Sequence, residues 1–206
     1  TDFCPLTETD FQEIRLMENP YYLEKLTSMN NKLIETIEAN KKKTGFTINE
    51  TGEVANEDLF ASIISKFRGK VMLVDFWATW CGPCRASFAY VKPLQEYAKA
   101  NDIVLLYLSI DRLEEDAKWR KMASHYDLMG EHVRVQEAFK DEIYTTFGNA
   151  QKALSIPRCV IIGKDGEIKF KSAASPEDME KLKSQLKEAA QTGDALMLVH
   201  LLRRGL

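Results

Sequence analysis

Apolar residues near the start of the chain recur at helical spacing. Phe11, Ile14 and Met17 would share one helical face. They overlap Thr9-Asp10-Phe11-Gln12, which has the form of a capping box. The pattern therefore predicts a short helix that ends before Asn19.

A second, longer helix is predicted from Asn19-Pro20 to about Lys42. Asn19 has the residue type of an N-cap, and proline is well suited to the first helical position. The apolar positions of this helix form one stripe: Tyr22, Leu26, Met29, Leu33 and Ile37. We expect the stripe to be buried on the body of the same domain, with a partner surface as the alternative.

Short apolar runs separated by turn residues follow. Residues 46–48 and 53–55 flank Asn49-Glu50-Thr51-Gly52, and this arrangement predicts a β-hairpin. Residues 56–67 predict a helix that ends at Gly69. Its apolar residues at helical spacing are Leu59, Phe60, Ile63 and Ile64.

Two near-continuous apolar runs predict strands covered on both faces. The first, 71–77, contains one acid, Asp75, and the second, 103–110, is followed by Asp111. Segment 86–100 between them has a helical pattern. Further along, a helix is predicted around Trp119 and Met122, a short strand at 129–135, and a helix around Phe139, Ile143, Tyr144 and Phe147.

The remaining elements are a strand hairpin and a helix. Lys164-Asp165-Gly166-Glu167 predicts the turn between strands 156–162 and 168–171. Ser175 and Pro176 predict the start of a helix that ends at Gly193. The tail 195–202 is apolar nearly all round, which predicts burial on its own domain or against another subunit.

These elements predict an α/β sheet with helices on both faces. We divide the chain into an N-terminal helical extension (1–44), a main domain (45–190) and a C-terminal helical tail (191–206). A length of 206 residues with 45% apolar residues suits one domain with additions, or two small domains.

Charge and hydropathy argue against several classes of partner. The net charge of −3 leaves no basic surface for nucleic acid, and no apolar run approaches the length of a membrane span. Four cysteines are too few for a disulfide scaffold, and Cys4 has no motif around it. Because the chain begins at Thr1, we expect a processed or trimmed form, in which any export signal is no longer visible.

The segment Trp80-Cys81-Gly82-Pro83-Cys84-Arg85 joins the first buried strand to helix 86–100. At a helix start, unpaired backbone N–H groups and the helix dipole favour a thiolate at Cys81. Two intervening residues let the sulfurs meet within one helical turn, and Pro83 fixes its own φ. The pair can therefore close reversibly, which is the chemistry of thiol–disulfide exchange.

Zinc binding is the competing interpretation of Cys-x-x-Cys. Structural zinc needs four ligands, and neither a second Cys-x-x-Cys nor a His pair at zinc-ligand spacing follows. His125, His132 and His200 lie far along the chain. We therefore expect no metal and no cofactor; a helix start that carries two thiols by chance is the remaining alternative.

Residues 74–85 resemble the signature of the thioredoxin superfamily almost residue for residue. The predicted hairpin and the long segment between Asp111 and Pro157 are similar to the TlpA/ResA group of bacterial thiol–disulfide oxidoreductases, as are residues 108–111 and 156–166. The similarity covers about residues 45–190. It implies a thioredoxin fold, a central mixed sheet flanked by helices, with an N-terminal β-hairpin. The N-terminal helical extension lies outside the similarity and is predicted from the apolar pattern alone.

The resemblance also implies roles for individual residues. Cys81 would be the attacking thiolate and Cys84 the resolving thiol. Pro157 would be a cis-proline that faces the pair and offers backbone groups to an extended substrate. The residues implied in substrate binding are Trp80, Gly82, Pro83, Ile156, Pro157 and Arg158.

Asp75 matches the buried acid that thioredoxins keep beneath the active site. Burial there would raise its pKa and suit it to proton transfer with Cys84. An acid inside an apolar run needs a reason to be there. The structural alternative is a strand-end acid whose charge a neighbour satisfies.

Several positions depart from the family pattern. Ser87 and Ala89 stand where the TlpA/ResA group commonly has Glu and Pro, which leaves Asp75 as the main candidate base and argues against a narrow cytochrome-maturation role. Arg158 stands where thioredoxin has Thr; it would stabilise the Cys81 thiolate, select acidic partners or point outward. Cys159 is expected to be a core residue turned away from the site, with a third redox cysteine as the alternative.

The function predicted is a thiol–disulfide oxidoreductase that reduces the disulfides of exported proteins. The resemblance implies a periplasmic or membrane-anchored location and a membrane electron donor. Two alternatives are a non-catalytic or redox-linked interaction module that works through the N-terminal helices, and a thiol peroxidase. A peroxiredoxin-type site would need Pro and Thr where this chain has Val74 and Ala78.

Overall fold

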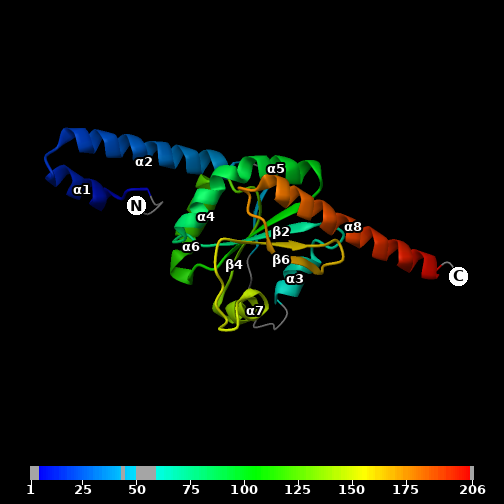
Figure 1. Ribbon diagram of the computed structural model, residues 1–206. Coiled ribbons are helices and arrows are strands. Elements are labelled where there is room, and N and C mark those ends of the chain that lie inside the picture. Colours follow the sequence, from blue (N-terminus) through cyan, green and yellow to red (C-terminus); the bar gives the residue numbers. More distant parts are fainter. Residues whose placement is uncertain (1–4, 43–44, 50–58, 205–206) are drawn as a thin grey trace.

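The computed structural model describes the backbone of residues 5–42, 45–49 and 59–204, and it has a central sheet flanked by helices (Figure 1). Within these residues six strands form one sheet in the order β1-β4-β3-β2-β5-β6. The strands are β1 Phe46–Ile48, β2 Met72–Trp77, β3 Val104–Ser109, β4 Gly130–Arg134, β5 Arg158–Ile162 and β6 Ile168–Ala173. Strands β1 to β4 pair in parallel, whereas β5 is antiparallel to both β2 and β6. The predicted mixed α/β sheet is confirmed.

Helices cover both faces of the sheet. They are α1 Glu8–Leu16, α2 Pro20–Lys41, α3 Leu59–Ser65, α4 Gly82–Ser87, α5 Val91–Ala100, α6 Asp116–His125, α7 Glu137–Phe147 and α8 Met179–Arg204, with short 3-10 turns at Phe88–Tyr90 and Leu113–Glu115. Figure 1 shows α5 and α8 above the sheet and α3 and α7 below it. Ring contacts agree, because Trp77 meets Phe88 near α5 at 5.2 Å while its neighbour Phe76 meets Phe147 of α7 at 5.1 Å. Alternate residues of β2 therefore face opposite helical layers.

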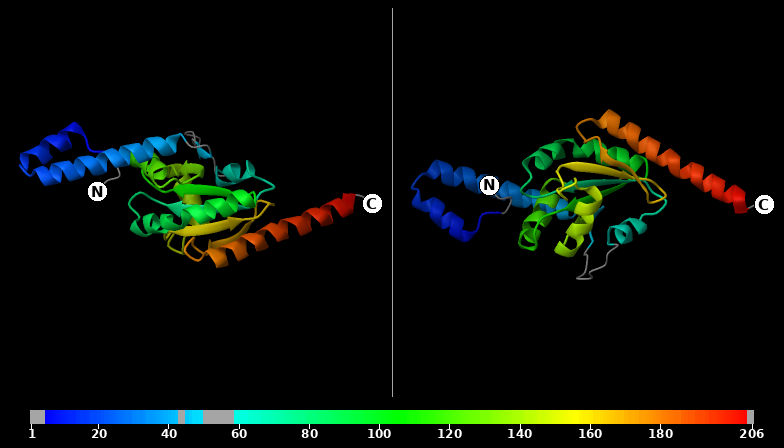
Figure 2. Two further views of the ribbon diagram at one scale, coloured as in Figure 1. Left: turned by 90° about the horizontal axis from the view of Figure 1, so that it is seen from above. Right: turned by 60° about the horizontal axis from the view of Figure 1, so that its bottom comes forward.

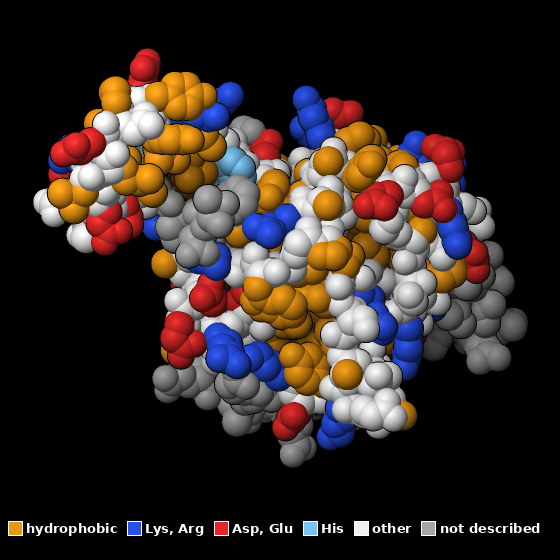
Figure 3. All heavy atoms as spheres, turned by 60° about the vertical axis from the view of Figure 1, so that its left-hand side comes forward, with side chains coloured by type: hydrophobic (Ala, Val, Ile, Leu, Met, Phe, Trp, Pro, Cys, Tyr) orange, Lys and Arg blue, Asp and Glu red, His pale blue; other side chains and the backbone are white. Residues whose placement is uncertain are grey.

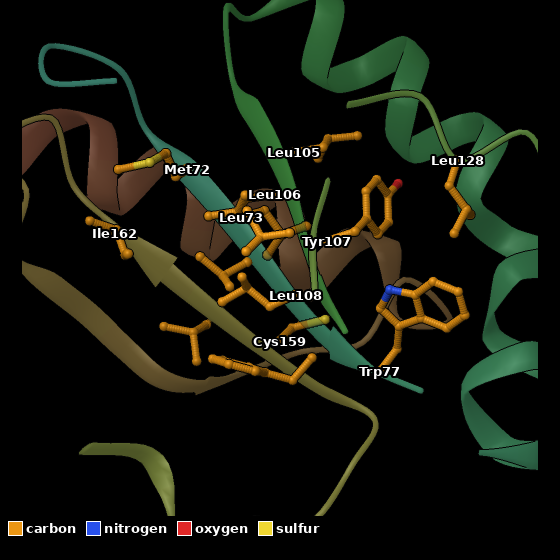
Figure 4. Close-up of a cluster of buried hydrophobic side chains, with 14 of the residues drawn as sticks. Met72, Leu73, Trp77, Leu105, Leu106, Tyr107, Leu108, Leu128, Cys159 and Ile162 are labelled. Carbon is orange, nitrogen blue, oxygen red and sulfur yellow. The ribbon is translucent and has the colours of Figure 1, made fainter. Parts of the chain in front are cut away.

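The core is centred on β2, where every residue is buried. Leucines of β2 and β3 fill the space between the strands and the helices, and Cys159 of β5 lies in the same cluster (Figure 4). This burial on both faces explains why the two strands are continuously apolar in sequence. Asp75 is the exception that the fold must accommodate.

The first helix begins earlier than predicted. Thr7, not Thr9, is the N-cap: its Oγ1 accepts a hydrogen bond from the Asp10 backbone at 3.2 Å, and Asp10 Oδ2 accepts one from the Thr7 backbone at 2.6 Å. The capping box is therefore formed by Thr7 and Asp10, because a short aspartate completes it as well as the predicted Gln12. The result is two more helical residues than the sequence pattern indicated.

Helix α2 begins as predicted, with Asn19 Oδ1 accepting a hydrogen bond from the Tyr21 backbone at 3.1 Å. Its C-terminal end packs on α6, where Ser124 Oγ donates to the Ile37 carbonyl at 2.9 Å and Asn40 donates to the Ser124 carbonyl. The rest of α2 projects from the body beside α1 (Figures 1 and 2). The stripe is therefore buried on the body only at this end, and Met29 remains 59% exposed.

The predicted hairpin is only partly within the described residues. Strand β1 exists, but it pairs in parallel with β4, with Phe46 opposite Gly130. Residues 53–55, its expected partner strand, lie outside the described residues, as do residues 56–58 of the next predicted helix. The partner of β1 is more than eighty positions along the chain, so a local pattern could not identify it.

Two predictions about helices were wrong. Segment 86–100 is not one helix, because a 3-10 turn at Phe88–Tyr90 separates α4 from α5. Helix α8 starts at Met179 with Asp178 as its cap, whose Oδ1 accepts a hydrogen bond from the Lys181 backbone at 3.2 Å. It also continues through Gly193 to Arg204, since one glycine costs a helix only about 1 kcal/mol. The predicted tail is thus a continuation of α8.

Within the described part of the chain, none of the helices has both the length and the apolar character that crossing a membrane requires.

Candidate active site

The loop after β2 delivers the cysteine pair to the start of α4. Cys81 is the N-cap of this helix, and its Sγ accepts a hydrogen bond from the Cys84 backbone N–H at 3.1 Å. The Cys81 N–H in turn donates to the Ala78 carbonyl at 3.1 Å, which closes the loop. A backbone donor aimed at the first sulfur is the local feature that favours a thiolate there.

Cys81 and Cys84 form a disulfide, with their Cα atoms 5.3 Å apart. In this oxidised form Cys81 is 4% exposed and Cys84 is fully buried. The disulfide holds the Cys81 sulfur against the protein. Cys81 is nevertheless the less shielded of the two, which is the order that an attacking and a resolving thiol require.

Asp75 lies in the middle of β2 and is 8% exposed. Burial raises the pKa of its carboxyl to about 7. Its partner across the antiparallel β2–β5 pair is Cys159, so both side chains project from the same face of the sheet. Among the described residues no hydrogen bond to the Asp75 carboxyl is present, and the neighbour that the structural interpretation required is not found.

A cavity of about 150 Å³ reaches Asp75 from the protein surface. It is lined by Asp75, Ser87, Ser155, Pro157, Arg158, Cys159, Ser172, Ala173, Ser175 and Pro176. A volume of this size holds several water molecules, and the serine hydroxyls offer them hydrogen-bond partners. The carboxyl can therefore exchange protons with solvent although the strand that carries it is buried.

The residues implied in substrate binding lie at the surface around this site. Trp80 is 62% exposed beside Cys81, and Gly82 and Pro83 are exposed at the start of α4. Pro157 is exposed at the beginning of β5, and the Ile156–Pro157 peptide bond is cis, as predicted. Pro157 and Asp75 line the same cavity, so the proline and the buried acid belong to one site.

Comparison with known proteins identifies the family to which the chain belongs. Residues 37–188 match the model of the Redoxin family. The chain belongs to the redoxin family. It is also similar to the thiol-disulfide oxidoreductase ResA of Bacillus thuringiensis subsp. konkukian, 27% identical over 125 residues that cover 61% of this chain and 66% of that protein.

Two further similarities have different extents. Thioredoxin of Coprinus comatus is 38% identical over 72 residues, covering 34% of this chain and 66% of that protein. A crystal structure of a putative thiol-disulfide oxidoreductase from Bacteroides vulgatus is 27% identical with a TM-score of 0.50, covering 61% of this chain and 82% of that one. The chain thus spans just under two thirds of the length of these curated relatives. The predicted ResA-like thioredoxin fold is confirmed.

Arg158, for which the sequence left three roles open, is bonded to helix α7. Its Nη1 donates a hydrogen bond to the Phe147 carbonyl at the C-terminal end of α7. Residue 158 pairs with Phe76, whose side chain faces α7, and not with Asp75. The guanidinium therefore holds the end of α7, where a cation is favourable.

Cys159 and Ser87 are the site residues that sequence reasoning placed wrongly or left without a role. We expected Cys159 to turn away from the site, yet it lines the cavity beside Asp75. Burial and the nearby Asp75 charge raise the pKa of its thiol, so it is a poor nucleophile there. Ser87 Oγ donates to the Cys84 carbonyl at 2.7 Å and also lines the cavity. The pairing of Cys159 with Asp75 depends on the register of β5 on β2, which the sequence pattern does not show.

No group of three or more His, Cys, Asp or Glu side chains able to hold a metal occurs among the described residues.

Proposed function

We propose that this chain catalyses thiol–disulfide exchange with protein substrates through Cys81 and Cys84. The observation that carries the proposal is the Cys81–Cys84 disulfide at the start of α4, with the Cys84 N–H 3.1 Å from the Cys81 sulfur. A dithiol that can close into a disulfide in this position can supply the two electrons that reduction of a substrate disulfide needs. Membership of the redoxin family supports the same chemistry.

The reaction starts from the dithiol. The Cys81 thiolate attacks one sulfur of a substrate disulfide, and the other substrate sulfur leaves as a thiolate and takes a proton from solvent. Cys84 then loses its proton and attacks the Cys81 sulfur, which releases the second substrate thiolate. The substrate disulfide is reduced, the Cys81–Cys84 disulfide is formed, and two electrons have passed from enzyme to substrate.

Asp75 is proposed as the base that takes the Cys84 proton. With a pKa of about 7 its carboxyl both accepts and returns a proton near neutral pH. The cavity supplies the route by which that proton exchanges with solvent. Ser87 stands where a second carboxyl is common in the ResA group, so Asp75 has no competing acid at that position.

The substrate is proposed to bind as an extended segment beside the cis-proline. Trp80, Gly82, Pro83 and Pro157 are all exposed, so an extended segment can contact them on its way to the Cys81 sulfur. Backbone groups next to Pro157 would hydrogen-bond this segment. Arg158 is not included, because its guanidinium is bonded to α7.

The direction and place of the reaction are further parts of the proposal. We propose that the chain reduces disulfides of exported proteins, outside the cytoplasm, and is itself reduced by a membrane electron donor. The support is the similarity to ResA proteins and the Gly82-Pro83 dipeptide between the cysteines.

Turnover of insulin disulfides with a small dithiol as reductant tests the proposed activity. The wild type should reduce insulin, and Cys84→Ser should stop after the first attack and accumulate a mixed disulfide through Cys81. The double variant Cys81→Ser, Cys84→Ser retains Cys159 and is the matched control. A folded wild type that leaves insulin intact but consumes peroxide would favour the peroxidase alternative.

A further inference from the structure

A buried carboxylate that the exchange chemistry does not use lies at the end of β3. Asp111 is fully buried, and its carboxylate accepts hydrogen bonds from Thr79 and Ser109. The Thr79 N–H lies 3.1 Å from Oδ1 and 2.9 Å from Oδ2, and the Thr79 hydroxyl lies 2.8 Å from Oδ1. Ser109 Oγ donates to Oδ2 at 2.7 Å and accepts from the Asp111 N–H at 3.1 Å. Both carboxylate oxygens are thus occupied.

Thr79 is the point at which this carboxylate holds the active-site loop. Strands β2 and β3 end side by side, with Trp77 opposite Ser109 and the Ile110 N–H donating to the Trp77 carbonyl at 3.0 Å. Beyond that pair the chain leaves the sheet, and Thr79 is 1% exposed while the next residue, Trp80, is 62% exposed. Cys81 follows directly, so the buried anchor is two positions from the attacking sulfur.

Both the Asp111 carboxylate and the Thr79 N–H need a hydrogen-bond partner where they are buried. A buried ionised carboxylate is tolerated only when donors satisfy its oxygens. The buried Thr79 N–H equally needs an acceptor, and no strand is available to it after β2 ends. Thr79 Oγ1 also lies 3.5 Å from Oε2 of Glu115, which is a second, more distant acceptor for the same hydroxyl. Without Asp111 the loop would have to shift to find another partner.

We propose that Asp111, acting through Thr79, is a positioning residue for Cys81. The bonds between Asp111 and Thr79, which we call the Asp111–Thr79 clamp, fix the loop so that the Cys81 sulfur stands in line with the Cys84 sulfur during resolution. The inference rests on the proposed role of the two cysteines. It does not depend on which protein is the substrate, or on whether a protein substrate is turned over at all.

Resolution of a mixed disulfide with glutathione tests the clamp. Cys81 of the reduced protein is loaded at low pH by exchange with glutathione disulfide, which releases one glutathione, and the excess reagent is removed. After a pH jump the release of the second glutathione is followed. In that step the Cys84 thiolate attacks the Cys81 sulfur and the glutathione thiolate leaves, so its rate measures the alignment of the two sulfurs. Alkylation of Cys81 by iodoacetamide across pH measures the acidity and access of the thiol alone.

The clamp predicts a split between these two measurements. Thr79→Val, which keeps the shape but removes the hydroxyl, should slow glutathione release by about 10- to 100-fold, while the alkylation rate changes less than about twofold. Thr79→Ser restores the hydroxyl and should release glutathione close to the wild-type rate. Asp111→Asn, which replaces one acceptor oxygen with a donor, should also slow glutathione release. If Thr79→Val does not fold, Asp111→Asn is the variant that tests the clamp.

Other outcomes overturn the proposal. Equal release rates in folded Thr79→Val or Asp111→Asn and in the wild type would show that the clamp positions nothing. An equal fall in release and alkylation would show an effect on thiol acidity and not on alignment. A wild type that releases glutathione normally but reduces no insulin would contradict the proposed function and leave the clamp intact.

Discussion

Asp75 is expected to set the pH range in which Cys84 can attack. Its carboxyl has a pKa of about 7, so it is a free base above neutral pH and is protonated below it. Asp75→Asn should therefore slow insulin reduction by about 10²-fold and remove the rise in rate through pH 7. Rates measured across pH check this, with the exposed Asp102→Asn as the control. A profile identical to the wild type would return Asp75 to a structural role.

The same shift has the opposite consequence for stability. The unfolded chain ionises Asp75 near 3.8 and the folded chain near 7, so between these values the folded form keeps a proton that the unfolded form releases. The free energy of unfolding should fall as pH rises through this window. The free energy of unfolding of Asp75→Asn should exceed that of the wild type by about 1.4 kcal/mol for each unit of the shift at the upper end of the window. At pH 4 the two free energies should be equal. Urea unfolding at both ends of the window checks the sign; an Asp75→Asn variant less stable at pH 8 would contradict it.

Cys81 and Cys84 should differ in reactivity in the reduced protein. The Cys84 backbone N–H points at the Cys81 sulfur, whereas Cys84 is fully buried under the helix. Iodoacetamide near neutral pH should therefore label Cys81 first, as peptide mapping would show. Cys81→Ser is the control, because it should leave Cys84 unlabelled on the same time scale. Preferential labelling of Cys84 in the wild type would reverse the two roles.

At the scale of single elements, β4 carries a buried imidazole that should make the fold sensitive to acid. His132 stacks on Tyr107 of β3 at 5.0 Å and on Phe46 of β1 at 4.3 Å, and its Nε2 bonds to the Leu128 carbonyl at 2.7 Å. Burial lowers the pKa of His132 to about 4. The unfolded chain, which titrates near 6.5, then binds the proton first, so stability should fall as pH falls from about 6.5 to 4.

His132→Phe isolates this effect, because it keeps a ring between Phe46 and Tyr107 but cannot titrate. As the pH falls through the window, the free energy of unfolding of the wild type should fall relative to that of this variant by up to about 1.4 kcal/mol for each unit of the shift. Chemical unfolding at several pH values measures the difference. Asp75 acts with the opposite sign in an overlapping range, so the comparison must be between variant and wild type. The half-buried His125→Gln should show a smaller change; a constant difference between His132→Phe and wild type would refute the prediction.

The elements show where local patterns are sufficient and where they fail. Continuous apolar runs identified β2 and β3, and the Cys-x-x-Cys spacing identified the helix start, because these features depend on neighbours in sequence. Strand alternation does place Arg158 and Cys159 on opposite faces of β5, but the sequence does not show which of the two faces the site. Arg158 is bonded to the Phe147 carbonyl at the end of α7, and Cys159 faces Asp75. The pairing of β1 with β4 and the contact of Asp111 with Thr79 likewise depend on residues far apart in the chain.

On the scale of the whole molecule, the projecting helices are the part that the exchange chemistry does not explain. Apolar side chains gather on this pair and on the neighbouring body (Figure 3). Leu16, Met17, Tyr21 and Met29 are each more than half exposed. Among the described residues of these two helices, the hydrogen bonds to the domain come from the end of α2, through Ile37 and Asn40. The redox site lies on the domain itself, so its chemistry requires no residue of α1.

The direction of electron flow is also a property of the whole molecule, since it compares the dithiol and disulfide forms. The disulfide is stabilised relative to the dithiol when the reduced form gains little from its thiolate. In its proposed role beneath the pair, a buried Asp75 with a raised pKa opposes further negative charge there, and α4 is a helix of only six residues. Both features keep the Cys81 thiolate from being strongly stabilised. We therefore expect a reductant.

Equilibration with defined ratios of reduced and oxidised glutathione measures this directly. Free thiols are counted after acid quenching, and the double variant Cys81→Ser, Cys84→Ser supplies the background from the other cysteines. A potential near the thioredoxin value of about −270 mV is expected. Asp75→Asn should shift it upward, because removing the buried acid eases formation of the thiolate in the reduced form. A wild-type potential near the DsbA value of about −120 mV would instead make this chain an oxidant of its substrates.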